Sequence, residues 1–361
     1  MRDSHTTTTL TVAPFHDGAD LAGAQPRCAA DAQAIHDGRA PATWKAYRAD
    51  WAHWERWCEV NGRGALPSTP ATLTAYLHAL VADGYHASTI QRRLSTIAVR
   101  HRGAGWGSPT QDELVKSVWR GLRRQLGERG RTAPRQAAPA TTDVIARMLA
   151  TLDQATLIGA RDRALLLLGF AGALRRSELV ALDVADVAET PDGLKLRIRR
   201  SKTDQEATGR TVGVPYGSQR QTCPVRAWGD WLAASGITTG PAWRPVSRHG
   251  HLGEARLSDR AVSEIVKRSA QRAGLDPAEF SGRSLRAGLI TAAAAAGVPA
   301  HVIQRQSGHK TLGVLHGYIR EGDVFRDNAA AKVGLSWKPR HPSLVERRLR
   351  SCNTRLRTYR P

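Results

Sequence analysis

The 361-residue chain has few of the features that mark several common classes of protein. Its four cysteines, Cys28, Cys58, Cys223 and Cys352, are scattered, with no C-x-x-C pair and no histidine at ligand spacing. This pattern supports neither a zinc site nor a disulfide framework. No apolar run is long enough to span a membrane, and the N-terminus lacks the basic and then apolar pattern of a signal peptide. We therefore expect a cytoplasmic protein that has no metal site and no membrane partner.

Acidic residues are scarce relative to basic ones. The chain has 53 Lys and Arg against 32 Asp and Glu, which gives a formal net charge of +21 at pH 7. A small acidic metabolite does not need so strong a positive field, whereas a polyphosphate backbone would be attracted by it. With 41% hydrophobic residues and ten Trp, the chain can fill real cores, which counts against a basic tail protein. The composition favours a nucleic acid over a small-molecule substrate.

The N-terminal third is predicted to be helical after a flexible arm. Residues 1–38 show no sustained periodicity, and 39–128 carry apolar residues at three- and four-residue steps. An aromatic stripe of this kind is more typical of a core than of a ligand platform, and it contains Trp44, Tyr47, Trp51, Trp54 and Cys58. Thr69 is predicted to cap one helix, and Thr110 with Glu113 to form a capping box for another.

Basic side chains concentrate on the third and fourth predicted helices and in the linker that follows them. A charge run is usually a solvated face, but an excess placed beside a linker favours contact with phosphates. The candidate DNA-contacting residues of this region are Gln91, Arg92, Arg93, Arg123, Arg124 and Arg131. Residues 129–139 have the composition of a basic linker, 140–334 form a second predicted domain, and 335–361 a basic C-terminal tail.

The second domain is predicted to be mainly helical with a small antiparallel sheet, so the fold class is mainly α of the α+β type. Helices are expected over 142–152, 162–171, 257–273, 284–296 and 299–307, and after Cys223-Pro224. Near 194–214 the hydrophobic period changes to two, which predicts strands, and residues 211–215 can pair back across a turn.

Several chemically suggestive residues are spread along this domain. Arg175 and Glu178 lie in the segment ALRRSEL, where Ser177 is predicted to cap a short helix. Taken alone, this segment is typical of an ordinary helix boundary with a salt bridge. Lys202 lies in the turn between the two predicted strands.

Two arginines and two further residues complete the pattern. Arg283 and Arg286 stand three residues apart at a predicted helix start, on one face of the helix. His309 follows Arg286 by 23 residues, and Tyr318 follows His309 by nine. In order and spacing, these residues resemble the tyrosine recombinase (phage integrase) family over about 40–330.

This resemblance implies a site-specific DNA recombinase that needs neither a cofactor, nor a metal, nor ATP. A helical core-binding domain and a catalytic domain would hold double-stranded DNA, and four protomers would act on two sites. Arg175 and Arg286 would bind the scissile phosphate, and Tyr318 would attack it to form a 3′-phosphotyrosine. Lys202 would protonate the leaving 5′ oxygen, and His309 would donate a hydrogen bond to a nonbridging oxygen.

Three further residues complete the roles that the resemblance implies. Glu178 would support the site from behind, and Arg320 is a candidate contact with the DNA backbone. Arg283 departs from the family, which usually has His at this position as a general base. An arginine cannot deprotonate Tyr318, but its positive charge can lower the pKa of the phenol and stabilise the phosphorane.

Arg283 leaves three hypotheses open. The enzyme is active with an all-cationic site, or it is slowed, or the chain is a degenerate protein that only binds DNA. A type IB topoisomerase-like relaxase shares the tyrosine chemistry but fits the motif spacing less well. We favour an active recombinase because every other catalytic match is present, including Tyr318.

Overall fold

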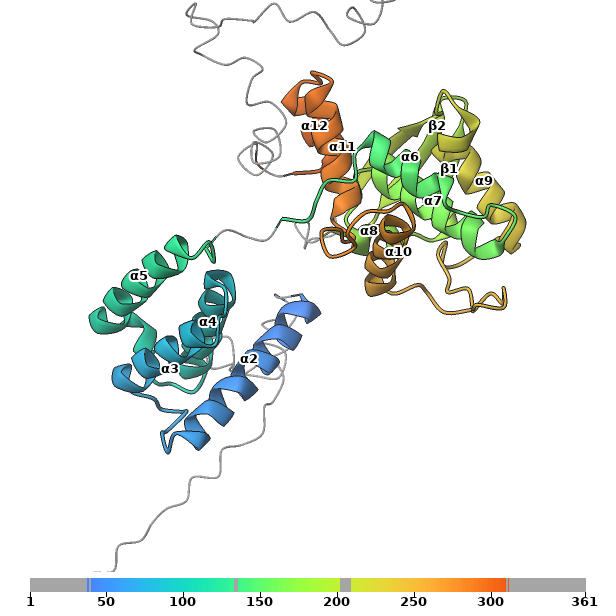
Figure 1. Cartoon of the computed structure of the whole chain (residues 1–361). Coiled ribbons are helices and arrows are strands. Elements are labelled where there is room, and N and C mark those ends of the chain that lie inside the picture. The colour runs from blue at the N-terminus through green and yellow to red at the C-terminus, as the bar shows by residue number, and fades with distance from the viewer. Residues whose placement is uncertain (1–37, 39, 133–135, 202–208, 310, 312–361) are drawn as a thin grey trace, which may run out of the picture. The chain divides into compact units, whose positions relative to one another are not determined.

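The computed structural model describes residues 38, 40–132, 136–201, 209–309 and 311 of the chain. Contacts between residues divide the chain into two compact units, 1–136 and 137–361 (Figure 1). Each unit has its own hydrophobic core. The described residues are mainly helical with one small antiparallel sheet, which confirms the predicted fold class. Within this part of the chain, the longest apolar helices fall short of what a membrane crossing requires.

The first unit consists of helices joined by short turns. Its described elements are α2 (Pro41–Val60), α3 (Pro70–Ala82), α4 (Ala87–Gly103), the 3₁₀ turn η2 (Pro109–Gln111) and α5 (Glu113–Glu128). Thr69 caps α3, as predicted, because its hydroxyl accepts a hydrogen bond from the backbone N–H of Thr72. The predicted capping box is wrong: Asp112, and not Thr110, caps α5, since the Asp112 carboxylate accepts from the N–H of Leu114 at 2.9 Å.

The aromatic stripe of α2 packs inward. Trp51, Trp54 and Cys58 are buried in the core of this unit, against apolar residues of α3, α4 and α5. Tyr76 of α3 meets Trp54 edge to face, with 4.8 Å between the ring centroids. Because such large aromatic side chains remove much apolar surface from water, they dominate the energy of a small helical core. Trp44 is also buried, in a small cluster with Val99 against which Tyr47 packs. The prediction that this stripe is core is therefore confirmed for Trp44, Trp51, Trp54 and Cys58.

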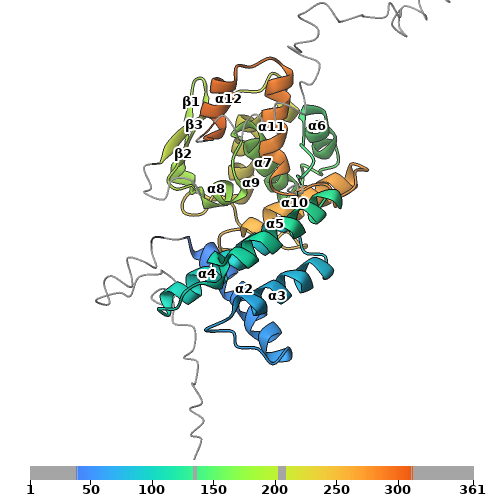
Figure 2. The same cartoon turned by 90° about the vertical axis from the view of Figure 1, so that its left-hand side faces the viewer.

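The second unit is built around one buried helix. Its described helical elements are α6 (Thr142–Ala150), α7 (Leu157–Ala171), α8 (Arg176–Ala181), η3 (Val184–Asp186), η4 (Arg220–Thr222), α9 (Pro224–Ser235), α10 (Asp259–Arg272), α11 (Ser284–Ala295) and α12 (Ala300–Ser307). Figures 1 and 2 show α7 among α6, α9 and α11, all of which contact it. The four leucines of 165–168 are all buried, so the continuous apolar run of α7 reflects burial on every side.

The sheet of this unit has three strands in the order β1-β2-β3, all antiparallel. The strands are β1 (Val187–Thr190), β2 (Gly193–Ile198) and β3 (Arg210–Pro215). Leu196 pairs with Val212 in the register of β2 and β3, and both side chains are buried. The predicted pairing of 211–215 with the preceding strand is confirmed, whereas β1 was not predicted. Figure 2 shows α12 beside this sheet, and Gln306 of α12 donates a hydrogen bond to the carbonyl of Gly213 at 3.0 Å.

Candidate active site

The structure describes Arg175, Glu178, Arg283, Arg286 and His309 among the predicted site residues. All five belong to the second unit. Lys202, Tyr318 and Arg320 were also predicted to take part in the site, and they lie outside the described residues.

The turn between α7 and α8 places two of these residues. Ala173 has φ +47°, a left-handed conformation that costs a residue with a Cβ about 1–2 kcal/mol. Arg175 precedes the first residue of α8, and the carboxylate of Glu178 accepts its backbone N–H at 3.0 Å. The predicted Ser177 cap is therefore wrong, because Glu178 folds back onto the start of its own helix.

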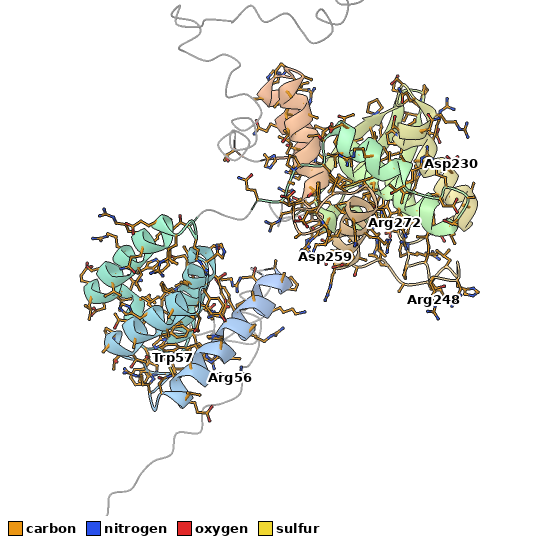
Figure 3. The ribbon with its side chains drawn as sticks, in the orientation of Figure 1. Arg56, Trp57, Asp230, Arg248, Asp259 and Arg272 are labelled. Carbon is orange, nitrogen blue, oxygen red and sulfur yellow. The ribbon has the colours of Figure 1, made fainter. Side chains whose placement is uncertain are left out.

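The two consecutive arginines of this turn point to different partners. Arg176 pairs with Asp259 at 3.2 Å, at the start of α10 (Figure 3), and donates to the hydroxyl of Ser263. Arg175 instead pairs with Glu178, with 2.5 Å between its Nη1 and Oε1. The structure thus distinguishes Arg175, which faces the candidate site, from Arg176, which attaches α8 to α10.

Glu178 is a buried carboxylate shared by two arginines. Its side chain is 0% exposed. Its Oε1 accepts from Arg175, and its Oε2 accepts from Nη2 of Arg210 at 3.1 Å. A buried carboxylate is stable only when its oxygens are paired in this way. Arg210 was not among the predicted site residues.

Arg286 joins three segments that are distant in the sequence. It lies in the first turn of α11 and is only 7% exposed. Its Nη1 donates to the carbonyls of Ala173 at 2.8 Å and Ser307 at 2.5 Å. Its Nη2 lies 3.0 Å from Nε2 of His309. The strained turn at Ala173 therefore presents a carbonyl to the predicted phosphate-binding arginine.

His309 follows the end of α12. Gly308 ends that helix with φ +66°, and Nδ1 of the next residue lies 2.8 Å from the hydroxyl of Ser307. Burial, followed by the charges of Arg286, Arg175 and Arg210, lowers the pKa of His309 to about 4. The imidazole is therefore neutral at pH 7, and it can accept from Arg286 through one nitrogen and donate through the other.

Arg283 differs from Arg286 in its surroundings. It stands just before α11 and is exposed, whereas Arg286 is buried. Its backbone N–H donates to the hydroxyl of Ser281, and no hydrogen bond or ion pair of its side chain is found within the described residues. The guanidinium of Arg283 is therefore open to a ligand that approaches from solvent.

We call Arg175, Glu178, Arg210, Arg286 and His309 the Glu178 cluster. With His309 neutral, its three guanidinium groups and one carboxylate leave two positive charges. Planar guanidinium groups held in place by such contacts are suited to the oxygens of a phosphate ester. No group of three His, Cys, Asp or Glu within the described ranges is arranged to hold a metal ion.

The candidate DNA contacts on α4 divide into exposed and buried residues. The side chain of Arg92 is 48% exposed, and its guanidinium forms two hydrogen bonds with Asp50, at 2.6 and 2.9 Å. Gln91 is exposed and accepts a hydrogen bond from Trp119. Arg93 is buried, with its guanidinium 4.1 Å from the ring centroid of Tyr85. These contacts with Tyr85 and Asp50 give Arg93 a structural role inside the first unit, and its contact with DNA stays a prediction.

The candidates on and after α5 lie mainly at the surface. Arg123 and Arg124 are exposed on α5, and Arg124 lies 3.8 Å from Glu128. Arg131 is partly buried, because its guanidinium donates to the carbonyl of Gly84 at the turn between α3 and α4. Arg131 therefore attaches the end of α5 to this turn.

Two family models match the chain, one in each of its two units. Residues 140–323 match the model of the phage integrase family, and 34–106 match the phage integrase N-terminal SAM-like domain. The chain belongs to the phage integrase family. It is 38% identical over 302 residues to the integrase/recombinase xerD homolog of Selenomonas ruminantium, a match that covers 83% of this chain and 87% of that protein. It is 26% identical over 297 residues to recombinase cre of Escherichia phage P1, covering 78% and 84% respectively.

Solved structures of a site-specific recombinase and of an integrase share the fold of this chain. The XerH site-specific recombinase bound to palindromic difH substrate, in a post-cleavage complex, gives a TM-score of 0.60 at 14% identity, over 84% of this chain and 82% of that chain. A lambda integrase dimer bound to a COC′ core site gives a TM-score of 0.54 at 17% identity, over 83% of this chain and 75% of that chain. As a member of this family, the chain is an enzyme of the tyrosine-type site-specific recombinase class.

Proposed function

We propose that this phage integrase family member cleaves and rejoins DNA strands at specific sites through a 3′-phosphotyrosine on Tyr318, without metal or ATP. The observation that carries the proposal is the Glu178 cluster. It holds the two predicted phosphate-binding arginines and the predicted histidine together, although Arg175 and Arg286 are 111 residues apart in the sequence.

In the proposed reaction, the phenol oxygen of Tyr318 attacks the phosphorus of the scissile phosphodiester. The bond from phosphorus to O5′ breaks as the new bond forms, and Lys202 supplies the proton that O5′ takes up. Rejoining reverses these steps with the 5′ hydroxyl of a partner strand. One phosphate ester bond replaces another at each step, so the reaction consumes no external energy source.

Arg175, Arg286 and His309 would stabilise the pentacoordinate phosphorane. Negative charge increases on its nonbridging oxygens as Tyr318 attacks, and fixed guanidinium donors match that charge better than mobile water does. Neutral His309 would contribute a hydrogen bond rather than a charge, in line with its lowered pKa. Glu178 would keep Arg175 in place, since their contact is short and the carboxylate is buried.

Arg283 would act as an additional cation. It replaces the usual histidine, and its exposed guanidinium can approach a bound phosphate or the Tyr318 phenol from solvent. A positive charge near a phenol stabilises the phenolate and so lowers its pKa. We therefore propose that proton removal from Tyr318 relies on cationic surroundings and solvent.

The proposed partner is double-stranded DNA, held by a core-binding domain over 39–128, a basic linker over 129–139 and a catalytic domain over 140–334. Arg92, Arg123 and Arg124 are candidate backbone contacts, with Gln91, Arg131 and Arg320 as further candidates. We also propose a homotetramer on two paired sites, working in the cytoplasm with no small-molecule substrate. A lambda integrase tetramer bound to a Holliday junction, similar in fold with a TM-score of 0.52 at 17% identity, supports the tetramer.

Strand exchange between two DNA duplexes that carry the recombination site tests this proposal. Candidate sites come from DNA that flanks the gene, and the assay contains a chelator of divalent metals and no ATP. We expect recombinant products with the wild type, and none with Tyr318→Phe at unchanged DNA affinity. Site-specific binding without products from either protein would favour the degenerate DNA-binding hypothesis. Relaxation of supercoiled DNA at many sequences, without exchange, would favour the topoisomerase hypothesis.

A further inference from the structure

Arg210 belongs to the Glu178 cluster although no sequence motif predicts it. It begins β3, and its Nη2 donates to Oε2 of Glu178 at 3.1 Å. Its Nη1 donates to the carbonyl of Gln306, in the last turn of α12, at 3.0 Å. One side chain thus connects the helix that carries Glu178 with the helix that leads to His309.

The backbone of α12 leaves room for this side chain. Gly308 ends α12 in the left-handed region, with φ +66°. A Cβ at this position would lie 2.8 Å from Nε of Arg210, closer than non-bonded atoms normally approach. The guanidinium of Arg210 therefore packs directly against the turn that places His309.

The charge balance around Glu178 also depends on Arg210. If Glu178 had Arg175 as its only cationic partner, the two would form a neutral pair, and Arg175 would be less available to an anion. With Arg210 on the other carboxylate oxygen, the two cations share one negative charge. Arg175 is then fixed in position while the cluster keeps a net positive charge.

We propose that Arg210 is a positioning residue of the active site. It holds Glu178 and the last turn of α12 in the arrangement in which Arg175, Arg286 and His309 bind the scissile phosphate. The inference rests on the proposed function for its effect on cleavage, but its effect on the cluster can be measured without DNA.

Three variants separate positioning from a general contribution to stability. Arg210→Gln removes the charge, and Arg210→Lys keeps the charge but cannot span both partners. The matched control is Arg163→Gln on α7. Arg163 likewise binds a carboxylate, that of Asp230 on α9 at 2.8 Å (Figure 3), and the carbonyls of Arg220 and Gln221. Among the described residues, no hydrogen bond or ion pair joins it to the Glu178 cluster.

The first readout is the single-turnover rate of cleavage of a nicked suicide duplex, measured with the full chain at saturating DNA. We expect Arg210→Gln to slow cleavage by about 10- to 100-fold, the range found when residues that orient metal ligands are removed. Arg210→Lys should recover part of this loss. Arg163→Gln should cleave as the wild type does at a temperature where all variants are folded, because it alters stability alone.

The second readout is the pKa of His309 in the free protein, followed by NMR of its ring nitrogens and assigned with His309→Gln. The charge of Arg210 is one of those that lower this pKa, so Arg210→Gln should raise it and Arg163→Gln should not. Because Arg210→Lys keeps the charge, a rise in this variant as well would report displacement of the cluster rather than loss of charge. A protein that shows this rise in both Arg210 variants but forms no covalent adduct would contradict the proposed function and leave the positioning role intact.

Two results would overturn the role of Arg210. One is wild-type cleavage by Arg210→Gln, and the other is a His309 pKa that does not change in this variant. If Arg210→Gln does not fold, Arg210→Lys tests the positioning role instead. This variant keeps the charge beside Glu178 but lacks the second guanidinium nitrogen that reaches the carbonyl of Gln306. Wild-type cleavage by Arg210→Lys would exclude any need for the link to α12.

Discussion

Glu178 shows how a single residue sets the charge balance of the cluster. Its carboxylate is buried and neutralises one of the two arginines that contact it, Arg175 and Arg210. Arg286 relies instead on two backbone carbonyls, which fix its position without cancelling its charge. The cluster therefore combines fixed donor geometry with an excess of positive charge, as a phosphate site requires.

The lowered pKa of His309 predicts a specific pH dependence of stability. The ordinary pKa is 6.5 and the folded value is about 4, so the unfolded chain binds an extra proton between these values. Stability is therefore lost as the pH falls from about 6.5 towards 4. Thermal unfolding at pH 7 and pH 5 should show a larger loss for the wild type than for His309→Gln. Equal losses in the two proteins would contradict a neutral, buried His309.

Restoring the usual histidine tests the role of Arg283. We expect Arg283→His to cleave DNA at least as fast as the wild type, because a general base is typically worth about 10²–10⁴-fold. Its cleavage rate should also acquire a pH dependence near the ordinary pKa of histidine. Single-turnover cleavage across pH measures both effects. A severe loss of rate would show that the site depends on this arginine.

Two arginines illustrate where sequence reasoning fails at the residue scale. Arg93 stands in a run of basic residues, a pattern typical of a surface. Inside the unit, however, its guanidinium packs over the ring of Tyr85 and pairs with Asp50. Arg210 occupies a strand position where a basic residue usually faces solvent. Its partners on α8 and α12 are 32 and 96 residues away. The spacing of residues along the chain cannot predict these contacts of Arg210, because they form only when α8, β3 and the end of α12 come together in the folded protein.

At the scale of elements, the ends of helices build the site. Arg175 precedes α8, Arg286 lies in the first turn of α11, and His309 follows α12. Three short connections therefore converge, and each is held by hydrogen bonds to the next. Helix positions were largely predictable, for α2 from its apolar periodicity and for α3 from the Thr69-Pro70 start signal. The capping residues of α5 and α8 were not predicted correctly, because several polar residues near a helix start can compete to cap it.

The end of α12 gives a prediction with a matched control. Gly308 and Gly236 both end helices with left-handed φ, of +66° and +65°. An alanine costs about 1–2 kcal/mol at either position, but only at Gly308 would its Cβ also meet Arg210. Gly308→Ala should therefore lower the free energy of unfolding more than Gly236→Ala does, and it alone should slow cleavage. Chemical denaturation and the cleavage assay measure this, and equal effects of the two variants would contradict the packing.

The exposed face of α5 gives a prediction about DNA affinity. If Arg123 and Arg124 contact phosphates, each substitution by Gln should weaken binding and reduce the slope of log affinity against log salt by about one. Arg272→Gln, at the exposed end of α10 (Figure 3), is the control and should leave the slope unchanged. Binding measured across a salt series tests this, and unchanged slopes for the α5 variants would remove them from the DNA interface.

The hydrophobic pattern of each strand explains why two strands of the sheet were predicted and the third was not. β2 and β3 alternate clearly between buried and exposed residues, whereas β1 has no buried residue in its four positions. A strand whose one core contact is the partly buried Val187 leaves too little hydrophobic alternation for its pairing with β2 to be predicted. The motif order named Arg175, Glu178, Arg286 and His309, which the structure brings together, but it gave no indication of the contacts that join them through Arg210.

At the scale of the whole molecule, the two units correspond to different demands of the proposed reaction. The second unit contains the Glu178 cluster and matches the phage integrase family over 140–323. The first unit contains the exposed arginines of α4 and α5. An excess of 21 positive charges over the whole chain favours a long polyanion as the partner of both.

The most direct test of the central claim is covalent trapping of DNA on Tyr318. The full chain is incubated with nicked suicide duplexes from the DNA that flanks its gene, in the presence of a metal chelator, and then denatured. We predict a covalent protein–DNA adduct that is absent with Tyr318→Phe, together with a free 5′ hydroxyl on the released strand. A site that both proteins bind specifically, but on which the wild type forms no adduct, would contradict the claim.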